Sequence, residues 1–369
     1  MGKRLIVAVT PYPVDLSVFP EASVAGSKTV PPPSIGQVVL PRFVRHLAVN
    51  FPDFELVSGC SIEDFNERKE EIKAAEILLV VEAPPSLLME VIPLLKSLRW
   101  VHSYLAGVDG LSAALRKLPC PSDPSLPLSR SGLLVTNAKG IYSSSLKEYA
   151  IAAIMHFAKQ VPRLQKNKSD NRWERFIVGE IKGKTAGFIG YGDIAREIAS
   201  ACKFFGMRCI AVRRDATRTC PYLDEVYASD SKDHLEVYRQ SDFVICSLPA
   251  TPETVNCISR EQFGAMKKTG VFISLGRGCV VDEEALLQAL NSSLISGAAL
   301  DVFQTEPLPA SSPLWGAPNL LLSCHNADWC ENYSVEASIQ LFEDNLIKFL
   351  NGAKTNEEML TPVDCNRGY

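Results

Sequence analysis

Four side chains that could bind an acid or transfer a proton follow short apolar runs in the second half of the chain. Three runs are each followed by such residues: Arg277, then Asp301 with Glu306, then His325. A guanidinium fork binds a carboxylate or polarises a carbonyl, and a histidine paired with a carboxylate can act as a general acid. If the runs are parallel strands, their carboxyl ends meet at the edge of the sheet where ligands bind. One such residue alone is usually structural, but four at three successive strand ends predict a site.

A glycine-rich turn supplies a second indication. The stretch 184–214, KTAGFIGYGDIAREIASACKFFGMRCIAVRR, reads as strand, turn through Gly187, Gly190 and Gly192, helix and strand. Such a turn lets backbone approach a pyrophosphate, whose charge lies on the amides of the helix N-terminus. Ala195 replaces the third glycine of the pattern, where only helix–strand packing is affected. We expect the dinucleotide to lie on Gly190, Tyr191, Gly192, Asp193 and Ile194.

The far end of this unit indicates which dinucleotide is preferred. An acidic residue about twenty positions beyond the glycines usually binds the ribose 2′-hydroxyl. Here that position holds Arg213 and Arg214, with Arg218 nearby. Two guanidinium groups could bind a 2′-phosphate, which favours NADP over NAD. The alternative is that both arginines form a solvated strand end.

The elements that must position these residues alternate along the chain, which is typical of parallel α/β sheets. Strands are expected at 3–9, 54–59, 77–81, 100–103, 133–137, 243–248, 270–275 and 297–302. Helices are expected at 37–49, 62–75 (facing solvent), 87–95, 144–159 (linking two domains), 282–291 and 332–350. The proline-rich stretches 12–36 and 119–132 predict irregular loops.

Composition excludes several classes of protein. The chain has 369 residues, 46% of them hydrophobic and 22% charged, so we expect a two-domain globular protein. A net charge of −4 gives no reason to expect nucleic acid or a membrane as partner. The eleven cysteines show neither C-x-x-C pairs nor metal-ligand spacing, so we expect reduced thiols, a cytoplasmic location and no bound metal.

Seven stretches together resemble the D-isomer-specific 2-hydroxyacid dehydrogenase family. They are LAGVDG (105–110), VTNAKG (135–140), GFIGYGDIA (187–195), SLPATPET (247–254), SLGRGCVVDEEAL (274–286), ALDVFQTEPLP (299–309) and SCHNAD (323–328). The resemblance implies a Rossmann-type doubly wound parallel sheet that binds NAD(P), plus a flavodoxin-like substrate-binding domain. It places the substrate domain at 1–140, completed by 328–369, and the NAD(P) domain at 141–327.

The resemblance also implies roles. Arg277 would bind the 2-oxo acid, His325 would donate the proton, and Glu306 would orient the histidine and favour its charged form. Asp301 would bind the nicotinamide carboxamide. Backbone amides of Leu105, Ala106, Gly107 and Val108 would bind the substrate carboxylate from the other domain. Further cofactor contacts are implied at Ser247, Leu248, Pro249, Thr254, Leu275 and Gly276.

The resulting interpretation is NAD(P)H-dependent reduction of a small 2-oxo acid, with glyoxylate or hydroxypyruvate as first candidates, by a homodimer. One alternative is a nucleotide-sensing interaction module, as in the family's corepressor branch. Another is a dehydrogenase for a larger or aromatic 2-oxo acid. Ser323 stands where many members begin the segment with proline or threonine, which should affect loop shape more than chemistry. Tyr104 and Trp329 could shape substrate preference, but packing is the more typical role of an aromatic residue.

Overall fold

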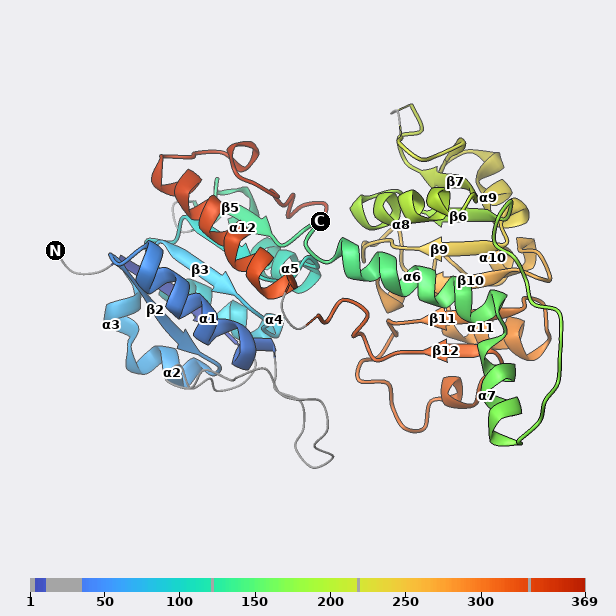
Figure 1. Cartoon of the computed structure of the whole chain (residues 1–369). Helices are drawn as coiled ribbons and strands as arrows, with labels where there is room; N and C mark the ends of the chain where they lie inside the picture. The colour runs from blue at the N-terminus through green and yellow to red at the C-terminus, as the bar shows by residue number, and fades with distance from the viewer. Residues whose placement is uncertain (1–3, 11–34, 121–122, 218–219, 331–332, 369) are drawn as a thin grey trace. The chain divides into compact units, whose positions relative to one another are not determined.

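The computed structural model describes residues 4–10, 35–120, 123–217, 220–330 and 333–368. Lys3, Arg218 and almost all of the expected loop 12–36 lie outside these residues. The chain divides into two compact units. Unit 1 comprises residues 1–141 and 330–369, and unit 2 comprises residues 142–329. Each unit is built on its own sheet (Figure 1).

Unit 1 contains a five-stranded parallel sheet in the order β2-β1-β3-β4-β5. This is the flavodoxin-like order that the resemblance implied. The strands are β1 (Arg4–Val9), β2 (Phe54–Gly59), β3 (Ile77–Val80), β4 (Trp100–Ser103) and β5 (Leu134–Asn137). The helices are α1 (Ile35–Asn50), α2 (Ile62–Glu67), α3 (Lys69–Ile72), α4 (Pro85–Val91), α5 (Asp109–Lys117) and α12 (Tyr333–Leu350).

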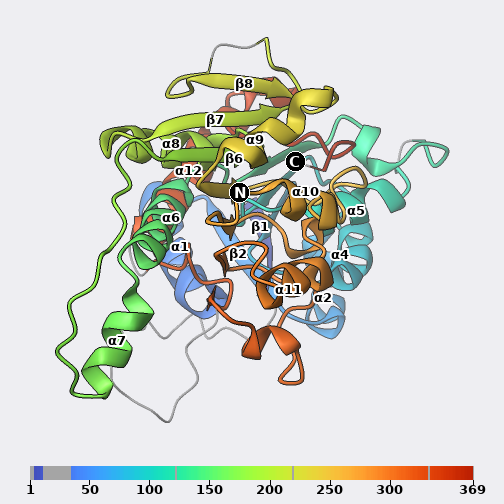
Figure 2. The same cartoon turned by 90° about the vertical axis from the view of Figure 1, so that its right-hand side faces the viewer.

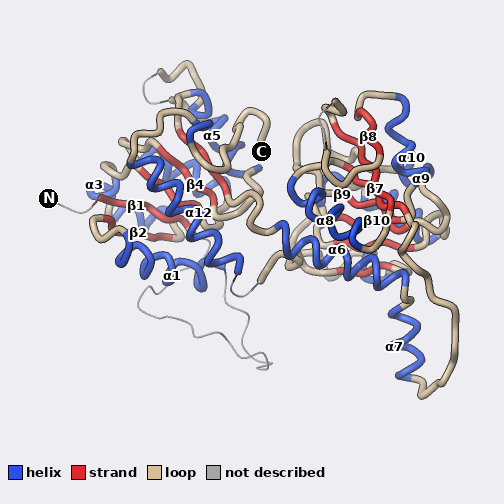
Figure 3. The backbone as a smooth tube through the Cα atoms, turned by 45° about the horizontal axis from the view of Figure 1, so that its top comes forward, coloured by secondary structure: helices blue, strands red, loops and turns tan. Residues whose placement is uncertain are grey.

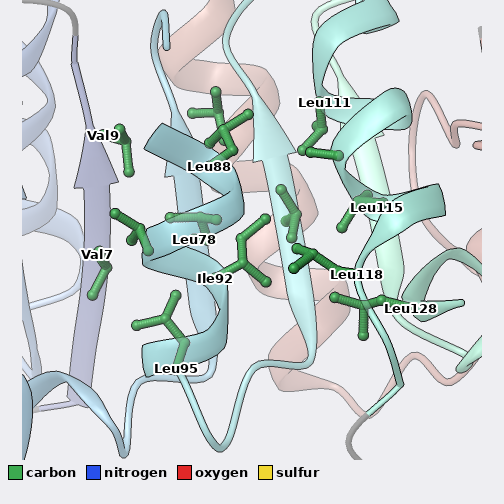
Figure 4. Packing of buried hydrophobic residues seen from close by; sticks show 14 of the residues in the cluster. Val7, Val9, Leu78, Leu88, Ile92, Leu95, Leu111, Leu115, Leu118 and Leu128 are labelled. Carbon is green, nitrogen blue, oxygen red and sulfur yellow. The ribbon is translucent and has the colours of Figure 1, made fainter. Parts of the chain in front are cut away.

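Two apolar layers hold unit 1 together. On one face, aliphatic side chains of α4 and α5, among them Leu88 and Leu115, pack on β-strand residues such as Leu78 (Figure 4). The other face is aromatic: Phe342 of α12 stacks on Trp100 with ring centroids 5.1 Å apart and meets Phe43 of α1 edge-on at 5.3 Å. A strand whose residues are all buried, as in β3 and β4, needs such a layer on each side.

Unit 2 contains a seven-stranded parallel sheet in the order β12-β11-β10-β9-β6-β7-β8. Figure 3 shows β7, β8, β9 and β10 of this sheet in red. The order reverses between β6 and β9, so the doubly wound Rossmann arrangement expected from the sequence is confirmed. The strands are β6 (Thr185–Ile189), β7 (Arg208–Arg213), β8 (Glu225–Ala228), β9 (Phe243–Cys246), β10 (Val271–Ser274), β11 (Gly297–Leu300) and β12 (Leu320–Leu322).

Helices cover both faces of the unit 2 sheet. α6 (Ser143–Ala158) packs on α8 (Asp193–Phe204) and reaches β10. α9 (Glu236–Gln240), α10 (Arg260–Ala265) and α11 (Glu283–Asn291) contribute Tyr238, Phe263 and Leu286 to the opposite layer. α7 (Val161–Ser169) has no buried residue and extends away from this sheet (Figure 2).

Several expectations are corrected by the structure. The helix expected over 62–75 breaks at Arg68, whose φ of −111° and ψ of 19° depart from helical geometry and separate α2 from α3. Gly187 lies inside β6 rather than in the turn, and glycine is needed there because a Cβ would collide with Ser241 Oγ. The loop 119–132 contains a 3₁₀ turn at Leu128–Arg130. The expected linker helix, α6, belongs wholly to unit 2. Short elements such as β8 and α5 were not predicted, whereas the strand expected before His325 is present as β12 (Leu320–Leu322).

Two observations bear on possible partners. Among the residues that the structure describes, no helix is long and apolar enough to cross a membrane. In the same residues, no group of three or more His, Cys, Asp or Glu side chains is placed to hold a metal ion.

Candidate active site

The glycine turn between β6 and α8 has two differently constrained positions. Gly190 has a φ of +82°, and a Cβ there would lie 2.7 Å from Leu248 Cδ2. Glycine is therefore required at this position both by conformation and by space. Gly192, the N-cap of α8, is extended, and a Cβ there would meet nothing within 4 Å. Nothing in the described protein fills the space beside Gly192, which lies at the helix N-terminus where phosphate groups are favoured.

The end of β7 lies where the sequence predicted it. Arg213 is the last residue of the strand, and Arg214, which follows, is exposed. Arg213 Nη1 donates to Cys220 Sγ, and the Tyr191 hydroxyl donates to the Pro221 carbonyl. The Tyr191 bond joins the glycine turn to the segment after β7, and the Arg213 bond ties that segment to the end of the strand.

The loop after β9 packs against the loop after β10. The Leu275 amide donates to Cys246 O at 2.9 Å, and a Cβ on Gly276 would collide with the Leu248 carbonyl. Thr254 Oγ1 closes the other end of the 247–254 loop by donating to Pro249 O at 2.7 Å. The first loop follows β9, at the reversal in strand order where open α/β sheets bind ligands, and the second follows the next strand, β10.

Arg277 is placed by the glycines on either side of it. Gly276 allows the approach to Leu248 described above, and a Cβ on Gly278 would collide with the backbone of Phe303. The arginine thus projects from a segment that neighbouring loops contact on both sides. Its own Nη1 donates to Gly276 O at 3.0 Å, and its side chain is half-buried.

His325 and Glu306 form a close pair. Nδ1 of the imidazole lies 2.6 Å from Oε2 of the carboxylate, and the other oxygen, Oε1, accepts the Phe303 amide at 2.8 Å. The hydrogen bond to Glu306 raises the pKa of His325, although burial and the nearby Arg277 oppose the shift. Burial acts to raise the pKa of Glu306, but the bonds from His325 and Phe303 outweigh it and lower that pKa. The pair therefore favours an imidazolium beside a carboxylate.

Asp301 organises the loop that carries His325. Its side chain is buried, and Oδ1 accepts Ser323 Oγ at 2.7 Å and the amides of Asn326 and Ala327 at 3.1 and 3.2 Å. Its carbonyl accepts the His325 amide at 2.8 Å. One residue at the end of β11 thus binds the loop that follows β12 at four points.

The segment 105–108 lies in unit 1, directly after β4. Ser103 Oγ donates to Leu105 O at 2.9 Å, and Asn137 Nδ2 donates to Ala106 O at 2.6 Å. Gly107 is half-buried, and Val108 caps α5. Tyr104, just before this segment, is buried and meets Phe43 edge-on, so it packs in the core.

Comparisons with known proteins identify the family. Residues 151–327 match the family model "D-isomer specific 2-hydroxyacid dehydrogenase, NAD binding domain". A glyoxylate reductase from Pyrococcus furiosus is 32% identical over 264 residues, which is 69% of this chain and 74% of that protein. The chain belongs to the D-isomer-specific 2-hydroxyacid dehydrogenase family.

Two further relatives agree with this assignment. A glyoxylate reductase from Korarchaeum cryptofilum is 29% identical over 297 residues, covering 77% of this chain and 82% of that protein. The crystal structure of a D-isomer specific 2-hydroxyacid dehydrogenase family protein from Aeromonas salmonicida has a TM-score of 0.74 at 26% identity, covering 99% of this chain and 100% of that one. The protein is accordingly an NAD(P)-dependent oxidoreductase that interconverts 2-oxo and 2-hydroxy acids.

Within this dehydrogenase, unit 2 brings together Arg277, Glu306 and His325, together with Asp301. Sequence reasoning gave no role to Asp328, although it ends the SCHNAD stretch. Its pKa is raised by burial, partly against the effect of the nearby His325. Ser145 and Tyr149 of α6, which also contact the histidine loop, were missed because helical periodicity marks them only as part of an amphipathic helix.

Proposed function

We propose that this dehydrogenase reduces a small 2-oxo acid, with glyoxylate and hydroxypyruvate as first candidates, to the D-2-hydroxy acid. The observation that carries the proposal is the His325–Glu306 pair at 2.6 Å, near the guanidinium of Arg277. The imidazolium of His325 can protonate an alkoxide. The guanidinium of Arg277 can bind a carboxylate and polarise a carbonyl oxygen.

Each residue has a defined task in this proposal. Bound NAD(P)H supplies the hydride to the carbonyl carbon. Because Nδ1 of His325 faces Glu306, Nε2 is the ring nitrogen that delivers the proton to the forming alkoxide oxygen. Glu306 stabilises the imidazolium beforehand and fixes its orientation. Arg277 binds the substrate carboxylate and polarises the carbonyl.

The residues around the glycine turn fit the cofactor. Gly190, Tyr191, Gly192, Asp193 and Ile194 would hold the pyrophosphate, since the space beside Gly192 is open at the N-terminus of α8. We assign the remaining contacts to Ser247, Leu248, Pro249, Thr254, Leu275 and Gly276, whose loops lie beside the reversal in strand order.

Asp301 would bind the nicotinamide carboxamide. Its Oδ1 is occupied by three donors, whereas among the described residues Oδ2 has one longer contact, 3.3 Å from the Ala327 amide. A carboxylate oxygen accepts more than one hydrogen bond, so Oδ2 can accept the carboxamide N–H.

We propose NADPH as the preferred reductant. Arg213 and Arg214 stand at and just beyond the end of β7, where the ribose 2′ position is expected. Arg214 is exposed, and its fork can bind a 2′-phosphate in two places. We likewise assign substrate binding to residues 1–140 with 328–369, through the backbone of Leu105, Ala106, Gly107 and Val108, and cofactor binding to 141–327.

The test is a substrate panel. Purified protein would receive NADPH or NADH with glyoxylate, hydroxypyruvate, pyruvate or phenylpyruvate, and loss of reduced-nicotinamide absorbance would be followed. Faster oxidation of NADPH with glyoxylate or hydroxypyruvate supports the proposal. A strong preference for phenylpyruvate would instead support a dehydrogenase for a larger or aromatic 2-oxo acid. Tight cofactor binding without turnover would support a nucleotide-sensing module.

We further propose that the protein is a homodimer formed through α7 and the segment 170–181. Trp173 and Ile177 in this segment are 95% and 92% exposed, which is unusual for large apolar side chains grouped together. Sedimentation of the native protein should give a dimer, and Trp173→Ser with Ile177→Ser should give a monomer. A native monomer would contradict this part of the proposal.

We place the enzyme in the cytoplasm. None of the eleven cysteines forms a disulfide, and six of them are accessible to solvent. Cys324 is exposed, and the other five, which are partly accessible, are Cys60, Cys220, Cys257, Cys279 and Cys330. Free thiols in such number suit a reducing compartment. Recovery of the native protein in a membrane or secreted fraction would contradict this location.

A further inference from the structure

The loop that carries His325 adopts a backbone that needs external support. His325 has a φ of +51°, in the left-handed region. For a residue with a Cβ this conformation costs roughly 1–2 kcal/mol and persists only where the surroundings enforce it. Asp301 supplies part of this support, as described above. Helix α6 supplies further contacts.

Two hydroxyl groups on one face of α6 reach the histidine loop. Ser145 Oγ donates to Ala327 O at 2.6 Å, and four residues later the Tyr149 hydroxyl lies 2.7 Å from Ser323 Oγ. Residues four apart in a helix lie on the same face, so the pair contacts both ends of the loop. The loop segment 323–327 is thereby held between α6 and Asp301.

Which hydroxyl donates in the Tyr149–Ser323 hydrogen bond follows from the single hydroxyl proton of Ser323. Ser323 has a single hydroxyl proton, and the carboxylate of Asp301, 2.7 Å from Ser323 Oγ, can only accept. Tyr149 therefore donates to Ser323, which donates to Asp301. Burial raises the pKa of Tyr149, so the phenol keeps its proton through the neutral range.

We propose that Ser145 and Tyr149 are positioning residues for the reduction, which hold the His325 loop, through Ser323 and Asp301, so that the imidazole meets Glu306. The inference rests on the proposed function, because His325 is taken as the proton donor. The proposal extends the site to two residues of α6, whereas the other proposed site residues lie in segments that follow strands.

The geometry explains why loosening these contacts would reach the chemistry. Glu306 is fixed separately, by the Phe303 amide, in the segment after β11. A loop released from α6 would move His325 while Glu306 stayed in place, which would lengthen the 2.6 Å contact between them. A displacement of about 1 Å in a catalytic group can reduce a rate about a hundredfold.

The experiment compares Tyr149→Phe and Ser145→Ala with controls in the full-length protein. Tyr227→Phe removes a hydroxyl that accepts Gln240 Nε2 at 2.8 Å in β8, and Ser144→Ala changes the neighbouring position of α6. Each test variant should lower kcat about tenfold, with the KM for NADPH within about twofold of native. Ser323→Ala should reproduce the loss, and Ser323→Thr, which keeps a hydroxyl, should restore most of the rate.

An NMR titration of His325 provides a readout that does not depend on turnover. In Tyr149→Phe the pKa of His325 should fall toward its ordinary value because the bond to Glu306 is weakened, whereas it should be unchanged in Tyr227→Phe. Arg277 and Asp328 also face His325 and are present in every variant, so they do not account for a difference.

The outcomes separate the two proposals. Native turnover with an unchanged kcat and an unchanged His325 pKa in Tyr149→Phe would overturn the positioning role. Equal losses in Tyr149→Phe and Tyr227→Phe, each with lowered thermal stability, would also overturn it. If the native protein turned over no 2-oxo acid, the proposed function would fail, and the titration would still decide whether α6 positions His325.

Discussion

Replacing Glu306 by glutamine tests the central pair with a minimal change of shape. The amide retains an oxygen that can accept the Phe303 amide, a bond of 2.8 Å in the native protein. What is lost is the negative charge 2.6 Å from Nδ1 of His325. Since Glu306 is the main cause of the raised pKa of His325, that pKa falls in the variant.

The size of the effect follows from the separation and the exposure. Two unit charges 2.6 Å apart interact by about 1.6 kcal/mol at the dielectric constant of water. The side chains are 41% and 34% exposed, so we use this well-screened value as a conservative figure. It corresponds to about a fifteenfold smaller imidazolium population at pH values above the pKa of His325 in both proteins.

The assay is the pH dependence of kcat/KM for reduction. The rate falls as pH rises through the pKa of His325, because the proton donor is lost. In Glu306→Gln this fall should begin at lower pH, and the loss relative to native should be about fifteenfold greater on the alkaline side than on the acid side.

A charge-matched control accompanies this variant. Glu236→Gln removes a carboxylate from an ion pair with Arg239, at 2.7 Å and similar exposure, on α9 of unit 2. It should leave the pH profile unchanged. Two results for Glu306→Gln would refute the conclusion that Glu306 raises the pKa of His325. One is a kcat/KM lowered by the same factor at every pH, and the other is a fall at alkaline pH that occurs at the same pH as in the native protein.

Three further predictions concern the same site. His325→Ala should lower reduction by about 10²–10⁴-fold while the fluorescence-measured affinity for NADPH stays near native, and unchanged turnover would remove His325 from the mechanism. Arg213→Asp with Arg214→Ala should lower kcat/KM for NADPH about a hundredfold and affect NADH much less; an unaltered cofactor preference would contradict the 2′-phosphate role. Gly192→Ala should weaken NADPH binding about tenfold by calorimetry, whereas Gly316→Ala, which also meets nothing within 4 Å, should not; equal affinities would move the pyrophosphate elsewhere.

Much of the fold was predictable because buried parallel strands leave a strong local pattern. β2 and β4 have the predicted bounds, and β9, β10 and β11 begin within one residue of them. The edge strand β8 lacks that pattern, since none of its residues is buried. The break at Arg68 was not predictable because Phe65 and Ile72, both buried, keep helical spacing across it.

The site was predictable only where chemistry follows a strand. Arg277, Asp301 and His325 follow β10, β11 and β12, and their roles remain proposals that the variants above test. The supporting contacts have no such signal: Tyr149 and Ser323 are 174 residues apart, and the bond between them depends on how α6 packs on the sheet. A serine and a tyrosine on a helix do not indicate that contact by type or by spacing.

The loop that carries His325 depends both on a strand that the sequence predicts and on packing contacts that it does not. β12 brings the chain to the edge of the sheet, but a strand end alone does not set the left-handed φ of His325. The loop that contains it is hydrogen-bonded to Asp301 at the end of β11 and to Ser145 and Tyr149 on α6, which are far apart in sequence. We therefore expect a substitution that loosens these contacts to impair the proposed proton transfer, even where every strand and every proposed catalytic residue is kept. Activity in this protein should depend on the packing of α6 as well as on the residues at the strand ends.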